Sequence, residues 1–145
     1  MLLQFLSALT ATAGFSILFN IPPRAIGAAA FSGALGWTGY LLIREIHGSP
    51  IMATFVGALI IGMMGEVFAR TLKNPTTVFV IPAMLPLVPG GSAYRTMLAL
   101  MQGRESEAIF LGLQTIGMAI ALAVGLVMVA SFARLLRRGF KKREG

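Results

Sequence analysis

Apolar segments long enough to cross a lipid bilayer account for most of this 145-residue chain. A transmembrane helix needs about 20 mostly apolar residues, and residues 2–19, 25–43, 51–69 and 108–133 are uninterrupted stretches of that kind. A fifth segment, residues 76–102, is apolar but is broken by prolines and glycines. We therefore predict an all-α polytopic membrane protein with five transmembrane segments, the fourth a broken helix. Residues 1–133 would form the helical bundle and residues 134–145 a basic cytoplasmic tail.

The composition excludes several classes of protein. The chain has no cysteine, which rules out disulfides, iron–sulfur clusters and thiolate-bound zinc, and we expect no metal or other cofactor. Of the 12 basic residues, six lie in the terminal run "RLLRRGFKKREG". A basic run directly after an apolar segment is typical of cytoplasmic anchoring to anionic lipid, so we expect no binding of nucleic acid. No nucleotide-binding or hydrolytic motif appears, and we do not expect an enzyme.

The distribution of basic residues indicates the orientation in the membrane. If the broken segment crosses the bilayer, the N-terminus lies outside and the tail inside. Arg24, Arg70, Lys73 and the tail are then cytoplasmic, whereas the outer loops contain Arg44 and Arg104. A four-segment arrangement would move most of these loop charges outside. The positive-inside bias therefore favours five segments.

The sequence "VIPAMLPLVPGGSAYR", residues 80–95, explains the interruption of the fourth segment. Prolines 82, 86 and 89 remove backbone donors, so a helix that continues through Pro86 and Pro89 is not expected. We expect Gly90 and Gly91 to permit a sharp change of direction before a second half-helix begins. A broken helix within a membrane is tolerated only where its backbone lines a cavity or is buried in protein. This arrangement around a midplane site is typical of secondary transporters.

The start of the second half-helix is the predicted substrate site. The free N–H groups at Gly90 and Gly91 and the positive end of the helix dipole favour a carboxylate. Arg95, one turn further on, would hold the same anion with its planar guanidinium group, and Ser92 and Thr96 would supply hydroxyls. The alternative for Arg95 is a structural anchor that reaches the outer headgroups.

Glu66 is the acidic residue within the third apolar segment. Charged residues within membrane segments usually face a bundle interior or a cavity and have a function, so Glu66 is a candidate proton carrier. The alternative is an i,i+4 ion pair with Arg70. Rows of small residues, such as Ser32 and Gly36, Ala58 and Gly62, or Gly117, Ala121 and Gly125, predict close packing of helices.

Three stretches also resemble a known family. "GFSILFNIPPRAIGAAAFSGALGWTGYLL", "ATFVGALIIGMMGEVFAR" and "NPTTVFVIPAMLPLVPGGSAYRTMLALMQG" are similar, in this order, to the threonine/serine exporter family. The similarity is to its small membrane subunit, which corresponds to the C-terminal half of the fused exporters. The resemblance implies a bacterial inner-membrane exporter of small amino or carboxylic acids and a larger partner subunit.

Together these features predict half of a secondary exporter for a small carboxylate-bearing metabolite, such as threonine, serine or a dicarboxylate. We also predict that export is coupled to an ion gradient. The other half of the exporter would be a larger membrane subunit or a second copy of this chain. Two alternatives stay open. One is a small multidrug-type exporter that uses Glu66 for cations, and the other is a scaffold subunit that does not transport.

Overall fold

The computed structural model describes residues 1–141, which form helices and connecting turns without any strand. The elements are α1 (Leu2–Leu18), α2 (Pro23–His47), α3 (Pro50–Thr71), α4 (Thr77–Met84), the single 3₁₀ turn η1 (Leu85–Leu87), α5 (Gly90–Met101) and α6 (Glu105–Lys141). The predicted all-α class and the interruption of the fourth apolar segment are both confirmed.

Four helical segments are long and apolar enough to cross a membrane. They are Pro23–His47, Pro50–Thr71, Thr77–Met101, which contains the break, and Glu105–Leu135. The apolar helix α1 is shorter, at 17 residues. These segments identify a multi-pass membrane protein.

Helix α6 extends beyond the predicted membrane segment at both ends. Its 37 residues give a length of about 55 Å at 1.5 Å per residue. The first part of the predicted basic tail, residues 134–141, is therefore helical and continues α6. Residues 142–145 of that tail lie outside the described part of the chain.

Small residues allow the long helices to approach one another closely. Helix α2 packs against α1, α3 and α4, and α3 packs against α6. A Cβ atom at Gly36 of α2 would lie 2.4 Å from Ile61 of α3, and a Cβ atom at Gly125 of α6 would lie 2.7 Å from Ala58 Cβ. Both distances are too short for a real contact, so these helix pairs depend on glycine. The predicted function of the small-residue rows as packing surfaces is confirmed at these positions.

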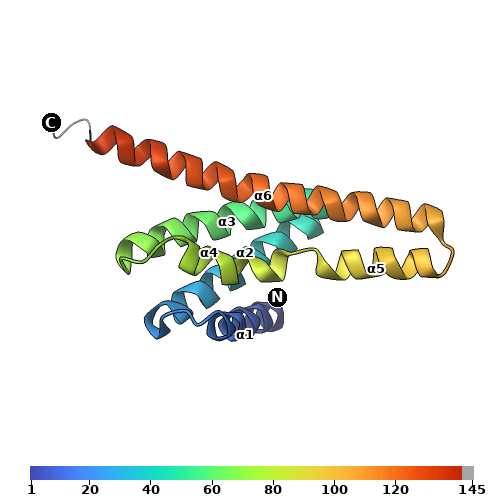
Figure 1. Ribbon diagram of the computed structural model, residues 1–145, viewed down its shortest axis with the longest axis horizontal. Helices are drawn as coiled ribbons and strands as arrows, with labels where there is room; N and C mark the ends of the chain where they lie inside the picture. The colour runs from blue at the N-terminus through green and yellow to red at the C-terminus, as the bar shows by residue number, and fades with distance from the viewer. Residues whose placement is uncertain (142–145) are drawn as a thin grey trace.

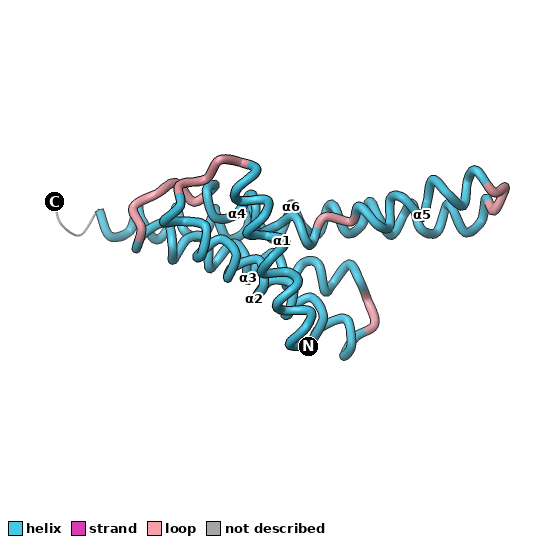
Figure 2. The backbone as a smooth tube through the Cα atoms, turned by 90° about the horizontal axis from the view of Figure 1, so that it is seen from below, coloured by secondary structure: helices cyan, strands magenta, loops and turns pink. Residues whose placement is uncertain are grey.

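Helix α5 and the first half of α6 form a hairpin that extends away from the other helices (Figure 1). The contacts of α5 with other elements are mainly with α6. In the perpendicular view this hairpin and the α2–α3 hairpin diverge (Figure 2). The break between α4 and α5 lies where the two arms separate.

Candidate functional site

The break in the fourth segment comes from its prolines. Pro86 lies within the 3₁₀ turn η1, and Val88, which precedes Pro89, is extended with φ −61° and ψ 127°. A residue before proline avoids the helical region because its backbone would clash with the proline ring. Pro89 has φ −77° and ψ 47°, and the Gly90 N–H donates to Val88 O over 2.8 Å. This tight turn of the inverse γ type ends the first half-helix, and α5 begins immediately after it.

The two glycines after the break do not serve the purpose that the sequence suggested. The glycines with positive φ in the described chain are Gly48 and Gly103, so Gly90 and Gly91 adopt a backbone conformation open to any residue. The prediction that they permit the change of direction is wrong, because the extended residue and the proline before them already provide it. A Cβ atom at either glycine would meet nothing within 4 Å. The space beside them is therefore open to a ligand.

A cavity of about 350 Å³ lies directly at this break. Its walls come from the end of α2, the start of α3, the turn before α5, and the facing sides of α5 and α6. The lining residues are Trp37, Tyr40, Arg44, Pro50, Pro86, Leu87, Val88, Pro89, Gly91, Ser92, Arg95, Leu111, Gln114 and Met118. We call it the arginine cavity. The irregular backbone thus lines a cavity, as a break at membrane depth requires.

Of the described residues that line the arginine cavity, two carry a guanidinium group and none carries a carboxylate. Arg95 comes from α5 and Arg44 from the end of α2. Among the side chains that the structure describes, the ion pair within 4 Å joins Arg104 and Glu107, so neither cavity arginine has an acidic partner there. Two cations without a counterion favour binding of an anion, and guanidinium groups match carboxylates in a bidentate geometry.

The predicted substrate residues divide into those that line the arginine cavity and those that do not. Gly91, Ser92 and Arg95 line it together. Gly90 begins α5 but is not part of the lining, and the Thr96 hydroxyl donates to the Ser92 carbonyl oxygen over 3.0 Å. Thr96 thus bonds to the backbone of its own helix and is not part of the cavity lining.

The structure adds groups that the sequence did not single out. A hydrogen bond of 2.8 Å joins the hydroxyls of Ser92 and Thr115, which connects α5 to α6. Trp37 and Tyr40 stack with ring centroids 5.1 Å apart and form part of the cavity wall. The sequence placed Arg44 in an outer loop. Only the tertiary arrangement brings the end of α2 to the cavity that α5 also lines.

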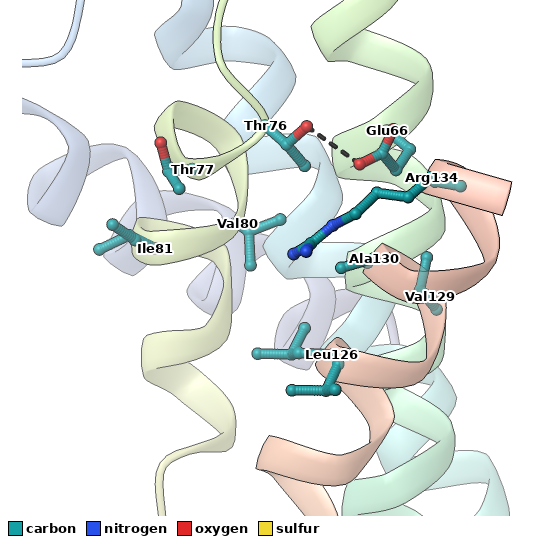
Figure 3. A pocket seen from close by; sticks show the side chains of 12 residues that line it. Glu66, Thr76, Thr77, Val80, Ile81, Leu126, Val129, Ala130 and Arg134 are labelled. Carbon is teal, nitrogen blue, oxygen red and sulfur yellow. Dashed lines mark hydrogen bonds between the residues drawn. The ribbon is translucent and has the colours of Figure 1, made fainter. Parts of the chain in front are cut away.

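Glu66 lies in a second cavity, near the α3–α4 turn. This cavity, of about 460 Å³, is lined by α3, α4 and α6, with the residues Gly62, Glu66, Thr76, Thr77, Val80, Ile81, Leu126, Val127, Val129, Ala130, Ala133 and Arg134. We call it the glutamate cavity. Thr76 Oγ1 donates to Glu66 Oε1 over 3.1 Å (Figure 3). The sequence left two interpretations of Glu66, a residue that faces a cavity and an i,i+4 ion pair with Arg70. The structure favours the first, since Arg70 is not its ion-pair partner among the described side chains.

Comparisons with known proteins give the family context of this geometry. Residues 4–132 match the family described as "Threonine/Serine exporter, ThrE". A protein from Haemophilus influenzae, described as uncharacterized, is 33% identical over 114 residues, which cover 76% of this chain and 38% of that relative. The chain therefore spans well under half the length of this relative. No solved structure matches the chain.

Proposed function

Because this chain belongs to the threonine/serine exporter family, we propose that it forms half of a secondary exporter for small carboxylate-bearing metabolites. Threonine, serine and dicarboxylates are the substrates that such a site would accept, and an ion gradient would drive export. The family is one of membrane transporters and not of enzymes.

The observation that carries the proposal is the arginine cavity at the helix break. It brings together the open backbone at Gly91, the Ser92 hydroxyl and the guanidinium groups of Arg44 and Arg95. These groups are donors without a carboxylate among them, which suits an anionic group of a substrate. A discontinuous helix beside such a cavity is the arrangement by which secondary transporters bind substrates.

A partner and a location follow from the same proposal. The chain covers 38% of the length of its relative, and α5 packs mainly against α6. A larger membrane subunit, or a second copy of this chain, would supply the other half of the transporter.

We place the complex in the bacterial inner membrane, with the N-terminus outside and the C-terminus in the cytoplasm. Glu66, in the glutamate cavity, is the candidate proton carrier.

Efflux from proteoliposomes that contain the co-purified complex tests this function. Arg95→Gln removes a charge-assisted hydrogen bond, which contributes about 1.5–3 kcal/mol, so carboxylate efflux per assembled complex should fall by about one to two orders of magnitude. Arg95→Lys keeps the charge but loses the planar fork, so its efflux should lie between that of the wild type and that of Arg95→Gln. Analogues that lack the carboxylate should be poor substrates of the wild-type complex.

Arg104→Gln is the matched control. Arg104 lies at the α5–α6 turn, pairs with Glu107 and does not line the cavity, so its loss should leave efflux near the wild-type rate. Wild-type efflux from Arg95→Gln would show that this arginine is only an anchor, and the proposed site would be wrong. Altered assembly with unchanged efflux per complex would instead indicate a scaffold subunit.

A further inference from the structure

A groove of about 670 Å³ runs between α3 and the second half of α6. None of the described residues that line it is charged, and apart from one serine the lining is apolar. We call it the apolar groove. Its lining includes Leu59 and Met63 from α3, and Val124, Met128, Ser131 and Leu135 from α6.

The apolar groove lies beside the close contact of α3 with α6. Val129, which is part of the lining, lies against Gly62 of α3, where an added Cβ atom would be 2.9 Å from it. Larger side chains flank this contact, and two of them, Met63 and Phe132, are exposed by 52% and 65%. On a membrane-spanning segment, apolar side chains exposed in this way face either lipid or another membrane helix.

The length of the groove fits an acyl chain. From Ala123 to Leu135, the rise of 1.5 Å per residue gives a length of about 18 Å. The hydrocarbon core of a bilayer is about 30 Å thick, so one leaflet takes up about half of it. A helix of a partner subunit would cross both leaflets, whereas a lipid acyl chain occupies one. The Leu135 end points toward the side that the basic residues predict to be cytoplasmic.

A basic residue continues the α3 side of the groove at that end. Residues four and seven positions apart share a helix face, which places Leu59, Met63 and Arg70 on one stripe of α3. The Arg70 side chain is exposed, as is that of Lys73 in the turn that follows. Among the described side chains, Arg70 has no ion-pair partner within 4 Å. On the other side, the sequence continues past Leu135 into a basic run.

We propose that the apolar groove binds one anionic phospholipid of the cytoplasmic leaflet. An acyl chain lies in the groove, and Arg70 binds the phosphate of the headgroup, because a guanidinium group matches phosphate oxygens in a bidentate geometry. This site differs from the anchoring of the basic tail, which is a general attraction to any anionic surface. It is also independent of the proposed export function, since Arg70 lines neither the arginine cavity nor the glutamate cavity.

Native mass spectrometry of the full chain in detergent, with any subunit that co-purifies, tests the site. Phosphatidylglycerol is the anionic probe and phosphatidylcholine the neutral one, and the dissociation constant of the first bound lipid is measured for each. Arg70→Gln removes the guanidinium group, and Ser131→Trp fills the groove from an exposed position. The matched controls are Arg24→Gln, at the exposed start of α2, and Ile116→Trp, on an exposed part of α6 outside the groove.

The two variants should have different effects. The wild type should bind phosphatidylglycerol at least about tenfold more tightly than phosphatidylcholine, as a charge-assisted hydrogen bond implies. Arg70→Gln should remove this preference and leave phosphatidylcholine within about twofold of the wild type. Ser131→Trp should weaken binding of both lipids several-fold, because both have acyl chains. Arg24→Gln and Ile116→Trp should bind both lipids like the wild type.

Three binding results would overturn the inference. The first is equal affinity of the wild type for the two lipids. The second is an equal loss in Arg24→Gln and Arg70→Gln, which would mean that only the total charge matters. The third is the same affinity in Ser131→Trp and Ile116→Trp. The two arginine variants decide the question even if a tryptophan variant fails to assemble, since both arginines are exposed.

A cross-linking experiment in native membranes distinguishes lipid from a protein partner. Val124→Cys introduces a single thiol into the groove of a chain without cysteine. With lipid in the groove, a thiol-directed cross-linker at this position should yield no product with a second protein chain. A product that contains a second chain would show that a partner helix covers the groove, and the lipid site would be wrong. The proposed export function is tested separately, by efflux through the Arg95 variants.

Discussion

At the scale of single residues, the open space beside Gly91 is the most direct support for the proposed binding of a ligand at the helix break. The backbone there requires no glycine, because Gly91 does not have a positive φ and a Cβ atom would meet nothing within 4 Å. Glycine has a lower helix propensity than alanine, so helix stability gives no reason for glycine at this position. Close approach of a ligand to the N–H groups of α5, as proposed, would explain why the position is left open.

Gly91→Ala separates this explanation from a structural one. We expect unchanged or slightly higher thermal stability, because the substitution restricts the unfolded chain and causes no clash. Carboxylate efflux should nevertheless fall several-fold, because Gly91 lines the arginine cavity and the new methyl group would take up space beside it. The measurements are melting temperature in detergent and efflux per assembled complex. Gly14→Ala in α1, where a Cβ atom also meets nothing within 4 Å, is the control. Equal efflux from both variants would mean that no substrate approaches Gly91.

At the scale of the elements, close packing of α3 against α6 holds the two cavities in position, because both are lined by α6. Gly125→Ala would place a methyl group 2.7 Å from Ala58 Cβ and 3.1 Å from the Phe55 carbonyl oxygen. The helices would have to separate, at a cost of about 1–3 kcal/mol for an overpacked contact. A lower melting temperature of the purified complex is therefore expected.

Gly27→Ala in α2 is the matched control for this packing prediction. A Cβ atom at Gly27 meets nothing within 4 Å, so alanine there should keep or raise the melting temperature through its better helix propensity. If Gly125→Ala and Gly27→Ala melt alike, the α3–α6 contact is looser than the structure indicates.

The elements also show what the sequence can and cannot predict. The broken helix was predictable, because Pro86 and Pro89 act on their own backbone and on the residue just before each of them. The presence of Arg44 and Arg134 in cavity walls was not predictable, because the sequence placed Arg44 in a loop and Arg134 in the basic tail. Both line cavities only through contacts with helices distant in the sequence. Charge in a cavity is a property of the tertiary arrangement, and no local pattern marks it.

At the scale of the whole molecule, the broken helix connects two cavities of different charge. The α4 half lines the glutamate cavity, and the break and the α5 half line the arginine cavity. The α5–α6 hairpin diverges from the α2–α3 hairpin (Figure 2), and residues of both hairpins line the arginine cavity. Movement of one arm against the other would open or close that cavity, which is how alternating access operates in transporters with broken helices.

The orientation of these two cavities in the membrane is the last prediction. The positive-inside bias places the α3–α4 turn in the cytoplasm and the α5–α6 turn outside. Because the chain has no cysteine, single substitutions can be labelled without background. Glu105→Cys should react with a membrane-impermeant maleimide in intact cells, whereas Lys73→Cys should react only after permeabilisation. An exporter with this orientation would release its substrate past the arginine cavity. The opposite labelling pattern would place the arginine cavity toward the cytoplasm, and the predicted orientation would be wrong.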